Sequence, residues 1–307
     1  VGTDTGNYVN MYYDFQFIKE TFLLLNSNIE VGYYYLEYVA SLFSSEYWSI
    51  LFFTAIVCVM CYLFVIVKLS ENYVLSIFIY ITLGTYLIFF NAGRQGIAVS
   101  ISAISLFFLI KKSMWKYFAV IIIASLFHRT VLIMLPLYFI LRLPFSYKKI
   151  VVFLVAGAIS FYFLSKFLTL FDSGVEERYA VYEDREATGG FLLAFFFILL
   201  TLFLVVIRNR ISKNEIIIYD IYLNFAIFTA IIYIVVVFTG SDVNFIRLTN
   251  YFAIGYILIF PIVFRNMRFF SNGIGKFLFI IVCLLFYGVY LSKMANLTPY
   301  LINSNLI

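Results

Sequence analysis

The only histidine of the chain, His128, lies beside Arg129 inside the otherwise apolar stretch 117–141. An ionisable pair at membrane depth is costly to bury, and it commonly marks a functional site. An imidazole can take a proton from a hydroxyl group near neutral pH, and an arginine can hold an anionic group beside it. His128 and Arg129 are therefore the first candidates for chemistry, provided that this stretch lies in a membrane.

The composition indicates a membrane protein. Hydrophobic residues make up 64% of the chain and charged residues only 12%, against about 25% charged in an ordinary soluble domain. Apolar stretches that approach the ~20 residues needed to cross a bilayer recur along the chain. They cover residues 47–67, 73–90, 95–110, 150–167, 191–207, 216–238, 248–264 and 277–291. The predicted fold class is all-α, a polytopic membrane protein with about nine to eleven transmembrane helices.

The stretch 117–141 is too long for one upright span and short for two full ones. We interpret it as two short helices that meet near His128 and Arg129, with Pro136 kinking the second. One long tilted helix is the alternative, and it would reverse the orientation of every later span. A break at His128 places most lysines and arginines on one side and most carboxylates on the other. The positive-inside rule therefore favours the break and makes the basic side cytoplasmic.

This topology gathers five separated segments on the outer face: residues 1–46, the turns 91–94, 128–129 and 240–247, and the loop 171–190. We interpret residues 1–307 as a single integral membrane domain. Its amphipathic outer-face segment covers residues 1–46, and its transmembrane bundle covers residues 47–307. Because the chain begins outside and with Val1 rather than Met, we expect a further transmembrane helix upstream.

Several classes of chemistry find no support in the sequence. Cys58 and Cys61 form a CxxC pair, but it lies in an apolar stretch, and no second pair or histidine completes a metal set. No nucleotide-binding glycine loop or zinc-peptidase motif is present. The net charge of +5 follows from the topology and does not indicate nucleic acid. We predict neither a metal nor a cofactor.

The polar outer-face segments carry a recognisable pattern. Residues 90–98 (FNAGRQGIA) and 123–130 (IASLFHRT) resemble the RQG-IA and IA-x-x-FH motifs of the EpsG/Wzy-type bacterial polysaccharide polymerases. Residues 2–8 and 30–33 (EVGY) resemble two further outer-face elements of that family. The resemblance is strongest up to residue 142, and a weaker late motif matches residues 244–252. The family commonly has a small hydroxyl residue where this chain has Arg129.

The resemblance implies a metal-independent glycosyltransferase of the bacterial plasma (inner) membrane, with an active site that faces the periplasm or exterior. It would polymerise oligosaccharide repeat units carried on undecaprenyl diphosphate into O-antigen, capsular or extracellular polysaccharide. Donor and acceptor would both be undecaprenyl-diphosphate-linked glycans. Membrane lipid, a flippase and a chain-length regulator are the other expected partners, and nucleic acid is not one.

This chemistry assigns roles to outer-face residues. The leaving lipid diphosphate needs cations, and the planar fork of arginine suits phosphate oxygens. The acceptor hydroxyl needs a general base. The predicted catalytic residues are His128, Arg94, Asp4 and Glu30, with the base left open between His128, Asp4 and Glu30. The predicted contacts to diphosphate or glycan are Arg94, Gln95, Arg129, Arg247, Arg178 and Tyr8.

Two other functions remain open. A flippase or transporter of lipid-linked oligosaccharides would also combine many helices with buried arginines, but its polar cavity should be reached from both sides. A membrane acyltransferase would also use an intramembrane histidine, but its acyl donor normally lies on the cytoplasmic side. The concentration of polar residues on one face favours the glycosyltransferase.

Overall fold

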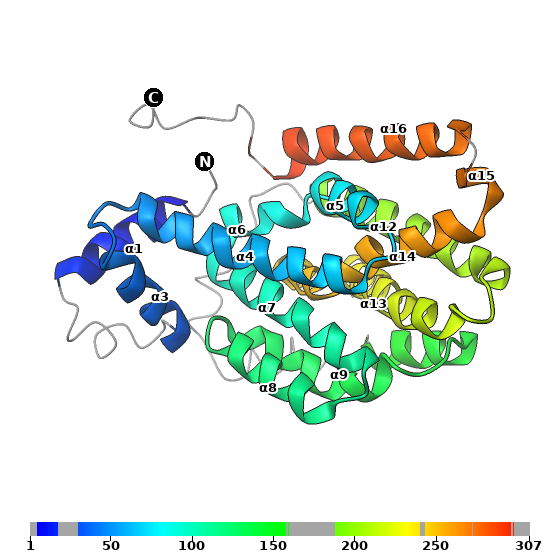
Figure 1. Cartoon of the computed structure of the whole chain (residues 1–307), viewed down its shortest axis with the longest axis horizontal. Helices are drawn as coiled ribbons and strands as arrows, with labels where there is room; N and C mark the ends of the chain where they lie inside the picture. Colours follow the sequence, from blue (N-terminus) through cyan, green and yellow to red (C-terminus); the bar gives the residue numbers. More distant parts are fainter. Residues whose placement is uncertain are drawn as a thin grey trace. The chain divides into compact units, whose positions relative to one another are not determined.

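The computed structural model describes residues 5–17, 30–157, 159, 188–239, 243–271, 273–295 and 297 (Figure 1). Every regular element in these residues is helical, so the predicted all-α class is confirmed. The chain divides into two compact units, which are treated separately below. The first unit holds residues 1–140 and 267–307, and the second unit holds residues 141–266. The assignment of residues 1–307 to a single domain stays a prediction.

Five helices in the described residues are long and apolar enough to cross a membrane, and the number rises to seven if two bent helix pairs each count as one span. The five are α4 (Trp48–Leu69), α7 (Gly93–Ile110), α12 (Thr188–Ile207), α13 (Ile216–Thr239) and α16 (Gly273–Val289). A polytopic membrane protein is thereby confirmed. The predicted span 150–167 contributed to the count of about nine to eleven; residues 150–157 are helical, and most of its second half lies outside the described residues.

Two predicted spans are broken. The span expected over residues 73–90 is α5 (Tyr73–Thr82) followed by η1 (Thr85–Leu87) and α6 (Ile88–Asn91), with a bend of 56°. Gly84 has a left-handed φ of 70°, which ends the helix at a position where a side chain would be strained. The second is η4 (Val243–Phe252) with α14 (Ile254–Asn266), bent by 42°.

The break predicted at His128 is confirmed. Helix α8 (Met114–Ser125) ends in a turn, and the chain continues as η2 (Arg129–Ile133) and α9 (Met134–Ile140). His128 itself is extended, with φ −163° and ψ 120°, and so cannot continue either helix. We expected Pro136 to kink the second helix. The chain changes from 3₁₀ to α geometry at Met134, two residues before this proline. Pro136 lies in the first turn of α9, where its missing N–H costs little.

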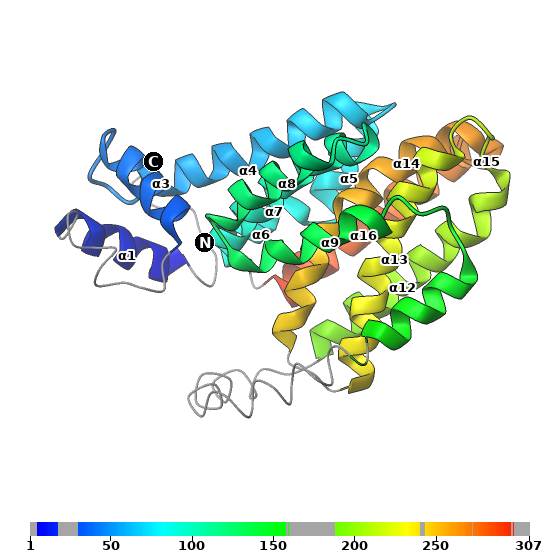
Figure 2. The same ribbon diagram turned by 90° about the horizontal axis from the view of Figure 1, so that it is seen from below.

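The described part of the segment 1–46 forms the helices α1 (Thr5–Phe17) and α3 (Val31–Ser41), which contact each other, and α3 also contacts α4. Tyr12 and Tyr33 are buried in one cluster with Ala40, Ile50 and Ile97. Figures 1 and 2 show α4, α7 and α8 side by side, and α3 packs against α4. The amphipathic segment is therefore fixed to the first unit by a shared apolar core, and it positions its polar residues against the start of α7.

Gly32 allows α3 to approach the turn that carries His128. The Gly32 N–H donates to the Leu126 carbonyl oxygen over 2.7 Å, and a Cβ on Gly32 would lie only 2.7 Å from the same oxygen. We expect Gly32→Ala to lower the free energy of unfolding by about 1–3 kcal/mol, because backbone must move to admit the methyl group. Thermal unfolding in detergent measures this. Gly288→Ala is the control, since nothing lies within 4 Å of its Cβ; equal stability of the two variants would contradict the close approach.

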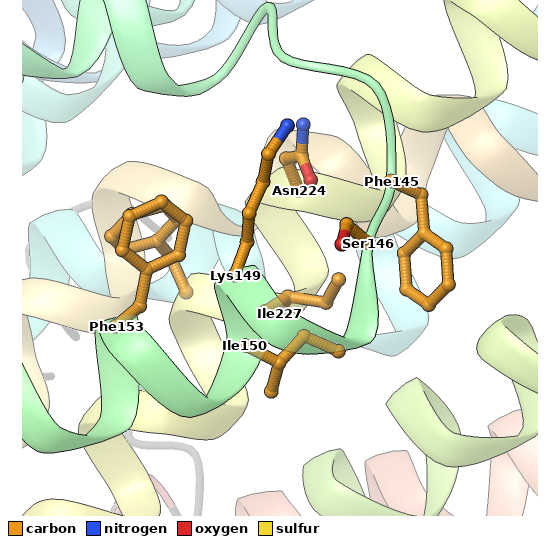
Figure 3. Close-up of a pocket in the computed structure, with 8 residues that line it drawn as sticks. Phe145, Ser146, Lys149, Ile150, Phe153, Asn224 and Ile227 are labelled. Atoms are coloured by element: carbon orange, nitrogen blue, oxygen red, sulfur yellow. The ribbon is translucent and has the colours of Figure 1, made fainter.

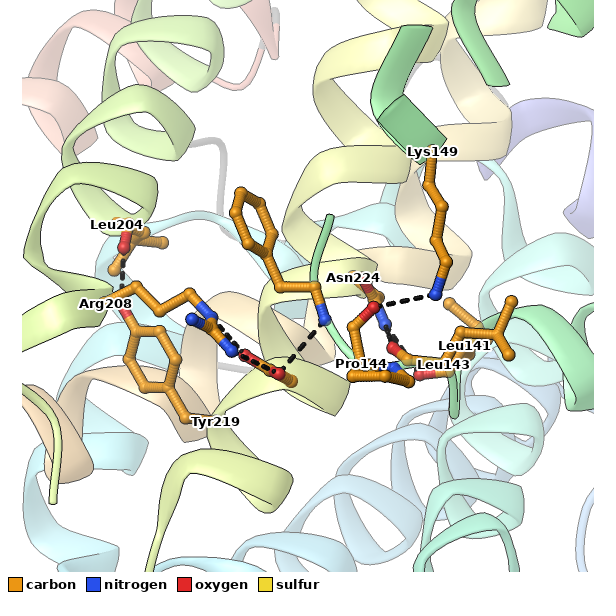
Figure 4. A network of polar contacts seen from close by, with 10 residues as sticks. Leu141, Leu143, Pro144, Lys149, Leu204, Arg208, Tyr219 and Asn224 are labelled. Atoms are coloured by element: carbon orange, nitrogen blue, oxygen red, sulfur yellow. Dashed lines mark hydrogen bonds and ion pairs between the residues drawn. The ribbon is translucent and has the colours of Figure 1, made fainter. Parts of the chain in front are cut away.

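In the second unit, two carboxylates near the start of α13, Asp220 and Glu215, are paired with arginines. Asp220 accepts hydrogen bonds from Arg208 Nε over 2.6 Å and from Arg208 Nη2 over 2.8 Å (Figure 4). It also accepts one from the Phe145 N–H over 3.1 Å. Glu215 pairs with Arg265. These acids therefore neutralise arginines near helix ends.

The connection before residue 147 is held by side chains of the same unit. Asn224 Nδ2 donates to the carbonyl oxygens of Leu141 and Leu143, and Lys149 Nζ donates to that of Pro144 (Figure 4). Figure 3 shows a pocket beside these residues. It is lined by Phe145, Ser146, Lys149, Ile150, Phe153, Asn224, Ile227 and Phe228. Its cavity of about 10 Å³ holds roughly one water, so it is too small for a sugar.

Candidate functional site

Glu30 brings together residues that are far apart in the sequence. Its Oε2 accepts a hydrogen bond from Arg94 Nη1 over 2.7 Å, and its Oε1 lies 3.2 Å from His128 Nδ1. Glu30 is the residue that precedes α3, but its side chain does not cap that helix. The carboxylate is instead 11% exposed and engaged by both partners. Three of the four predicted catalytic residues therefore form one constellation, the Glu30–Arg94–His128 triad.

The start of α7 positions Arg94 within this triad. The backbone N–H of Arg94 donates to the Tyr8 hydroxyl over 3.3 Å. A Cβ on the preceding residue, Gly93, would lie 3.2 Å from the Tyr8 ring, so glycine lets the ring lie close to the first turn. Tyr8 in turn packs against Tyr33, with ring centroids 5.8 Å apart. Tyr8, a predicted substrate contact, thus also links α1 to the helix that carries Arg94.

The turn between α8 and η2 positions His128. Because the Glu30 carboxylate only accepts hydrogen bonds, Nδ1 of His128 must be the protonated ring nitrogen. The neutral imidazole then carries its lone pair on Nε2, which makes no hydrogen bond to any residue in the described part of the chain. The side chain is 28% exposed. This geometry leaves one ring nitrogen available to accept a proton.

The pKa of Glu30 reflects its two partners. Burial raises the pKa of Glu30, but the hydrogen bond from His128 and the charge of Arg94 outweigh it, so the net pKa lies below the ordinary glutamate value. Glu30 is therefore ionised at neutral pH. Arg94 keeps 30% of its side chain exposed, so its guanidinium reaches the surface of the site.

The other predicted site residues are not joined to the triad by a hydrogen bond or ion pair that the described residues show. Gln95 is buried, with 5% of its surface exposed, in the first turn of α7. Arg129 is exposed beside His128 and makes no side-chain hydrogen bond or ion pair with a described residue. Arg247 is exposed on η4, in the second unit. Asp4 and Arg178 lie outside the described residues, as does most of the loop 171–190.

No metal-ligand cluster occurs among the residues that the structure describes: nowhere do three His, Cys, Asp or Glu side chains gather in a way that could hold an ion. Cys58 and Cys61 are free thiols on α4, and Cys283 is a free thiol on α16. The triad itself contains a carboxylate, a guanidinium and an imidazole.

Glu37 is a buried acid that the motif patterns do not single out. It lies on α3, two helical turns after Glu30, and it is fully buried. Its spacing of seven residues from Glu30 was a usable signal, because residues seven apart share a helix face. The surrounding run of tyrosines instead resembles an interfacial helix, which would keep an acid in water.

A comparison with protein-family models matches nearly the whole chain to one family. A family model described as the EpsG family matches residues 1–302. No curated protein and no solved structure matches the chain. The family match extends the motif resemblance, which was strongest up to residue 142, across both compact units.

Proposed function

Since this chain belongs to the EpsG family and thus has a polysaccharide-polymerase role, we propose that it is a membrane glycosyltransferase joining repeat units carried on undecaprenyl diphosphate. The observation that carries the proposal is the Glu30 carboxylate, which holds an arginine and a histidine at one site. An arginine suits the diphosphate of the donor, and an oriented imidazole suits the acceptor hydroxyl.

The proposed reaction is a single transfer. A hydroxyl oxygen at the non-reducing end of the acceptor glycan attacks the anomeric carbon of the donor glycan. The bond from that carbon to the diphosphate oxygen breaks, and undecaprenyl diphosphate leaves with the electron pair. The hydroxyl proton passes to Nε2 of His128. The energy is stored in the bond that breaks, so neither ATP nor a nucleotide sugar enters.

Each member of the triad has one task in this proposal. Glu30 orients His128 through Nδ1 and stabilises the imidazolium that forms. Arg94 binds the diphosphate and offsets its growing negative charge. Arg129, exposed beside His128, supplies a second cation. The general base, open between three residues on sequence alone, is therefore assigned to His128.

Further contacts to the glycan or diphosphate are proposed for Tyr8, Arg247 and Arg178, and Asp4 is kept as an alternative catalytic carboxylate. Burial of Gln95 favours a packing role over contact with sugar hydroxyls. The repeat units would come from a flippase, and a chain-length regulator would act on the polymer.

Deletion of the gene tests the function. A polymerase predicts that surface glycan collapses from a ladder to single repeat units, because units still reach the outer face but are not joined. Complete loss of surface glycan would indicate that the chain acts at an earlier step, for example as a flippase of lipid-linked oligosaccharides. An unchanged ladder would contradict the proposal.

We place the site on the outer face of the plasma membrane, since the positive-inside rule puts the His128 turn there. A cysteine at Thr130 is expected to react with a membrane-impermeant maleimide added to intact cells or spheroplasts. Cys58, Cys61 and Cys283 lie on apolar helices, so the parent chain is the background control. Labelling only after the membrane is opened would place the site inside, as an acyltransferase requires.

Glu30→Gln tests the central carboxylate. It keeps the shape but removes the charge, so His128 loses its oriented acceptor and turnover is expected to fall about 10²–10⁴-fold. Polymer formation by membranes with matched protein content measures this. Glu46→Gln, at an exposed glutamate, is the control and should keep activity. Comparable activity of both variants would remove Glu30 from the site.

The same variant reveals a pH dependence of stability. Because the pKa of Glu30 is lowered in the folded protein, its stabilisation is complete above the ordinary carboxyl pKa of about 4.3 and is lost as the pH falls through the folded value. The difference in thermal stability between the wild type and Glu30→Gln should therefore shrink below about pH 4.5. A difference that stays constant on acidification would contradict the ion pairs.

A further inference from the structure

Two breaks in the backbone set off a short half-helix directly before Arg94. The chain leaves α5 through the left-handed Gly84, and α6 ends at Asn91, after which Ala92 is non-helical with φ −157° and ψ 67°. The half-helix consists of η1 and α6, and Arg94 follows in the first turn of α7. Because helical hydrogen bonding is interrupted at both breaks, contacts with neighbouring elements must fix the direction of α6.

The half-helix packs closely on the turn that carries Arg94. A Cβ on Gly96, two residues after Arg94, would lie 3.0 Å from Cα and Cβ of Phe89. Phe89 belongs to α6, so the glycine lets α6 and α7 touch. Closely packed groups transmit displacement, because they leave no voids in which to relax. A movement of α6 would therefore shift the first turn of α7 and Arg94 with it.

The end of α16 holds the half-helix in place. Helix α16, drawn above α5 in Figure 1, contacts α5 and continues as the π-helical turn η5 (Tyr290–Met294). A Cβ on Gly84 would collide with the Tyr290 ring, so the ring fills the space that the glycine leaves. The hydroxyls of Tyr86 and Tyr287 share a hydrogen bond of 2.5 Å. The start of the half-helix is thus attached to a segment some 200 residues later in the chain.

Asn91 makes the contact that lies nearest to Arg94 along the chain. Its Nδ2 donates to the carbonyl oxygen of Ala295, the residue after η5, over 2.9 Å. A carbonyl at a helix end lacks a donor within the helix, and the Asn91 amide satisfies this one. Ala295 is only 2% exposed and clusters with Leu87 of the half-helix. The hydrogen bond therefore joins the two segments inside a small apolar cluster.

We propose that Asn91 is a positioning residue, whose hydrogen bond to the end of α16 fixes α6 and so aligns Arg94 with Glu30 and the lipid diphosphate. This inference rests on the proposed function, because it concerns how Arg94 meets the donor. Asn91 need not touch substrate. A displacement of about 1 Å at a reacting group can cost about 10²-fold in rate. Loss of the hydrogen bond should therefore lower kcat/KM for the donor, although every side chain of the triad remains.

Asn91→Leu tests the hydrogen bond, because leucine keeps the size of the side chain but removes its amide. We expect kcat/KM for a synthetic undecaprenyl-diphosphate-linked repeat unit to fall about 10–100-fold in liposomes. Tyr287→Phe removes one hydroxyl from the neighbouring contact and should give a smaller loss. Asn224→Leu is the matched control, because Asn224 also donates to backbone carbonyls but in the second unit. It should keep kcat/KM per folded protein.

A double-mutant cycle with Arg94→Lys separates positioning from stability. Substitutions that act through one shared group are not additive. Lysine already lacks the geometry of arginine, so in the Arg94→Lys background Asn91→Leu should cost about twofold or less. An equal loss in both backgrounds would show that Asn91 only supports the fold, and full activity of Asn91→Leu would also overturn the proposal. If Asn91→Leu does not fold, Tyr287→Phe enters the same cycle, and additivity there overturns the proposal.

Binding of undecaprenyl diphosphate to the purified chain separates this inference from the proposed function. The wild type should bind it more tightly than Asn91→Leu, and this difference should vanish in the Arg94→Lys background. If binding follows this pattern but no polymer forms, the polymerase proposal fails while the Asn91 proposal stands. If polymer forms and the cycle is additive, the Asn91 proposal alone fails. A wild-type chain that neither binds undecaprenyl diphosphate nor forms polymer overturns both.

Discussion

Arg94→Ala is expected to reduce polymer formation by about 10³–10⁵-fold, the range in which an arginine stabilises a departing phosphate. The loss has two sources. The guanidinium proposed to bind the diphosphate disappears, and Glu30 is left as a mostly buried carboxylate without its arginine partner. Single repeat units on their lipid carrier should accumulate. Electrophoresis of lipid-linked and surface glycans measures both effects.

Arg94→Lys separates charge from geometry. Lysine keeps a cation near Glu30 but lacks the fork that can reach a carboxylate and a phosphate at once. We expect an intermediate loss, with a raised KM for the donor. Arg210→Ala is the matched control, because Arg210 is exposed in the second unit. A normal chain-length distribution in Arg94→Ala would remove this residue from the site.

His128→Ala is expected to lower turnover by about 10²–10⁴-fold, the usual contribution of a general base. Donor binding should change little, since Arg94 keeps its contact with Glu30. The decisive readout is therefore kcat, measured with saturating donor and acceptor. Protein recovery and thermal stability check that the turn between α8 and η2 remains folded.

His128→Gln distinguishes a base from a spacer. A glutamine amide can donate to Glu30 in place of Nδ1, but it cannot accept a proton near neutral pH. We expect this variant to fold well and to be nearly as inactive as His128→Ala. Full turnover in His128→Gln would show that the histidine only orients its neighbours, and the base would then have to be sought at Asp4 or Glu30.

The sequence predicted which residues gather at the site better than it predicted the hydrogen bonds between them. The positive-inside rule placed Tyr8, Glu30, Arg94 and His128 on one face, and the structure brings these four together. The sequence could not predict that one carboxylate, Glu30, binds both Arg94 and His128. That depends on the close approach of Gly32 to the Leu126 carbonyl, a tertiary contact without a periodic signal.

Other features escaped prediction for similar reasons. The hydropathy of residues 73–90 predicts an unbroken apolar span. The left-handed Gly84, at which the chain bends, does not alter the average hydropathy of these residues. Glu37 belongs to a tyrosine-rich helix whose buried face is set by packing on α1 and α4. Long apolar spans such as α4 and α13 were predicted to within a few residues, because length and hydropathy determine them.

Reconstitution tests the central claim most directly. The purified chain in liposomes, supplied only with a synthetic undecaprenyl-diphosphate-linked repeat unit, should form a ladder of longer glycans. It should release one undecaprenyl diphosphate for each bond made, without ATP or nucleotide sugar, and Arg94→Ala should not. Folded wild-type protein that leaves the repeat unit chemically unchanged, or only moves it across the bilayer, would contradict the account.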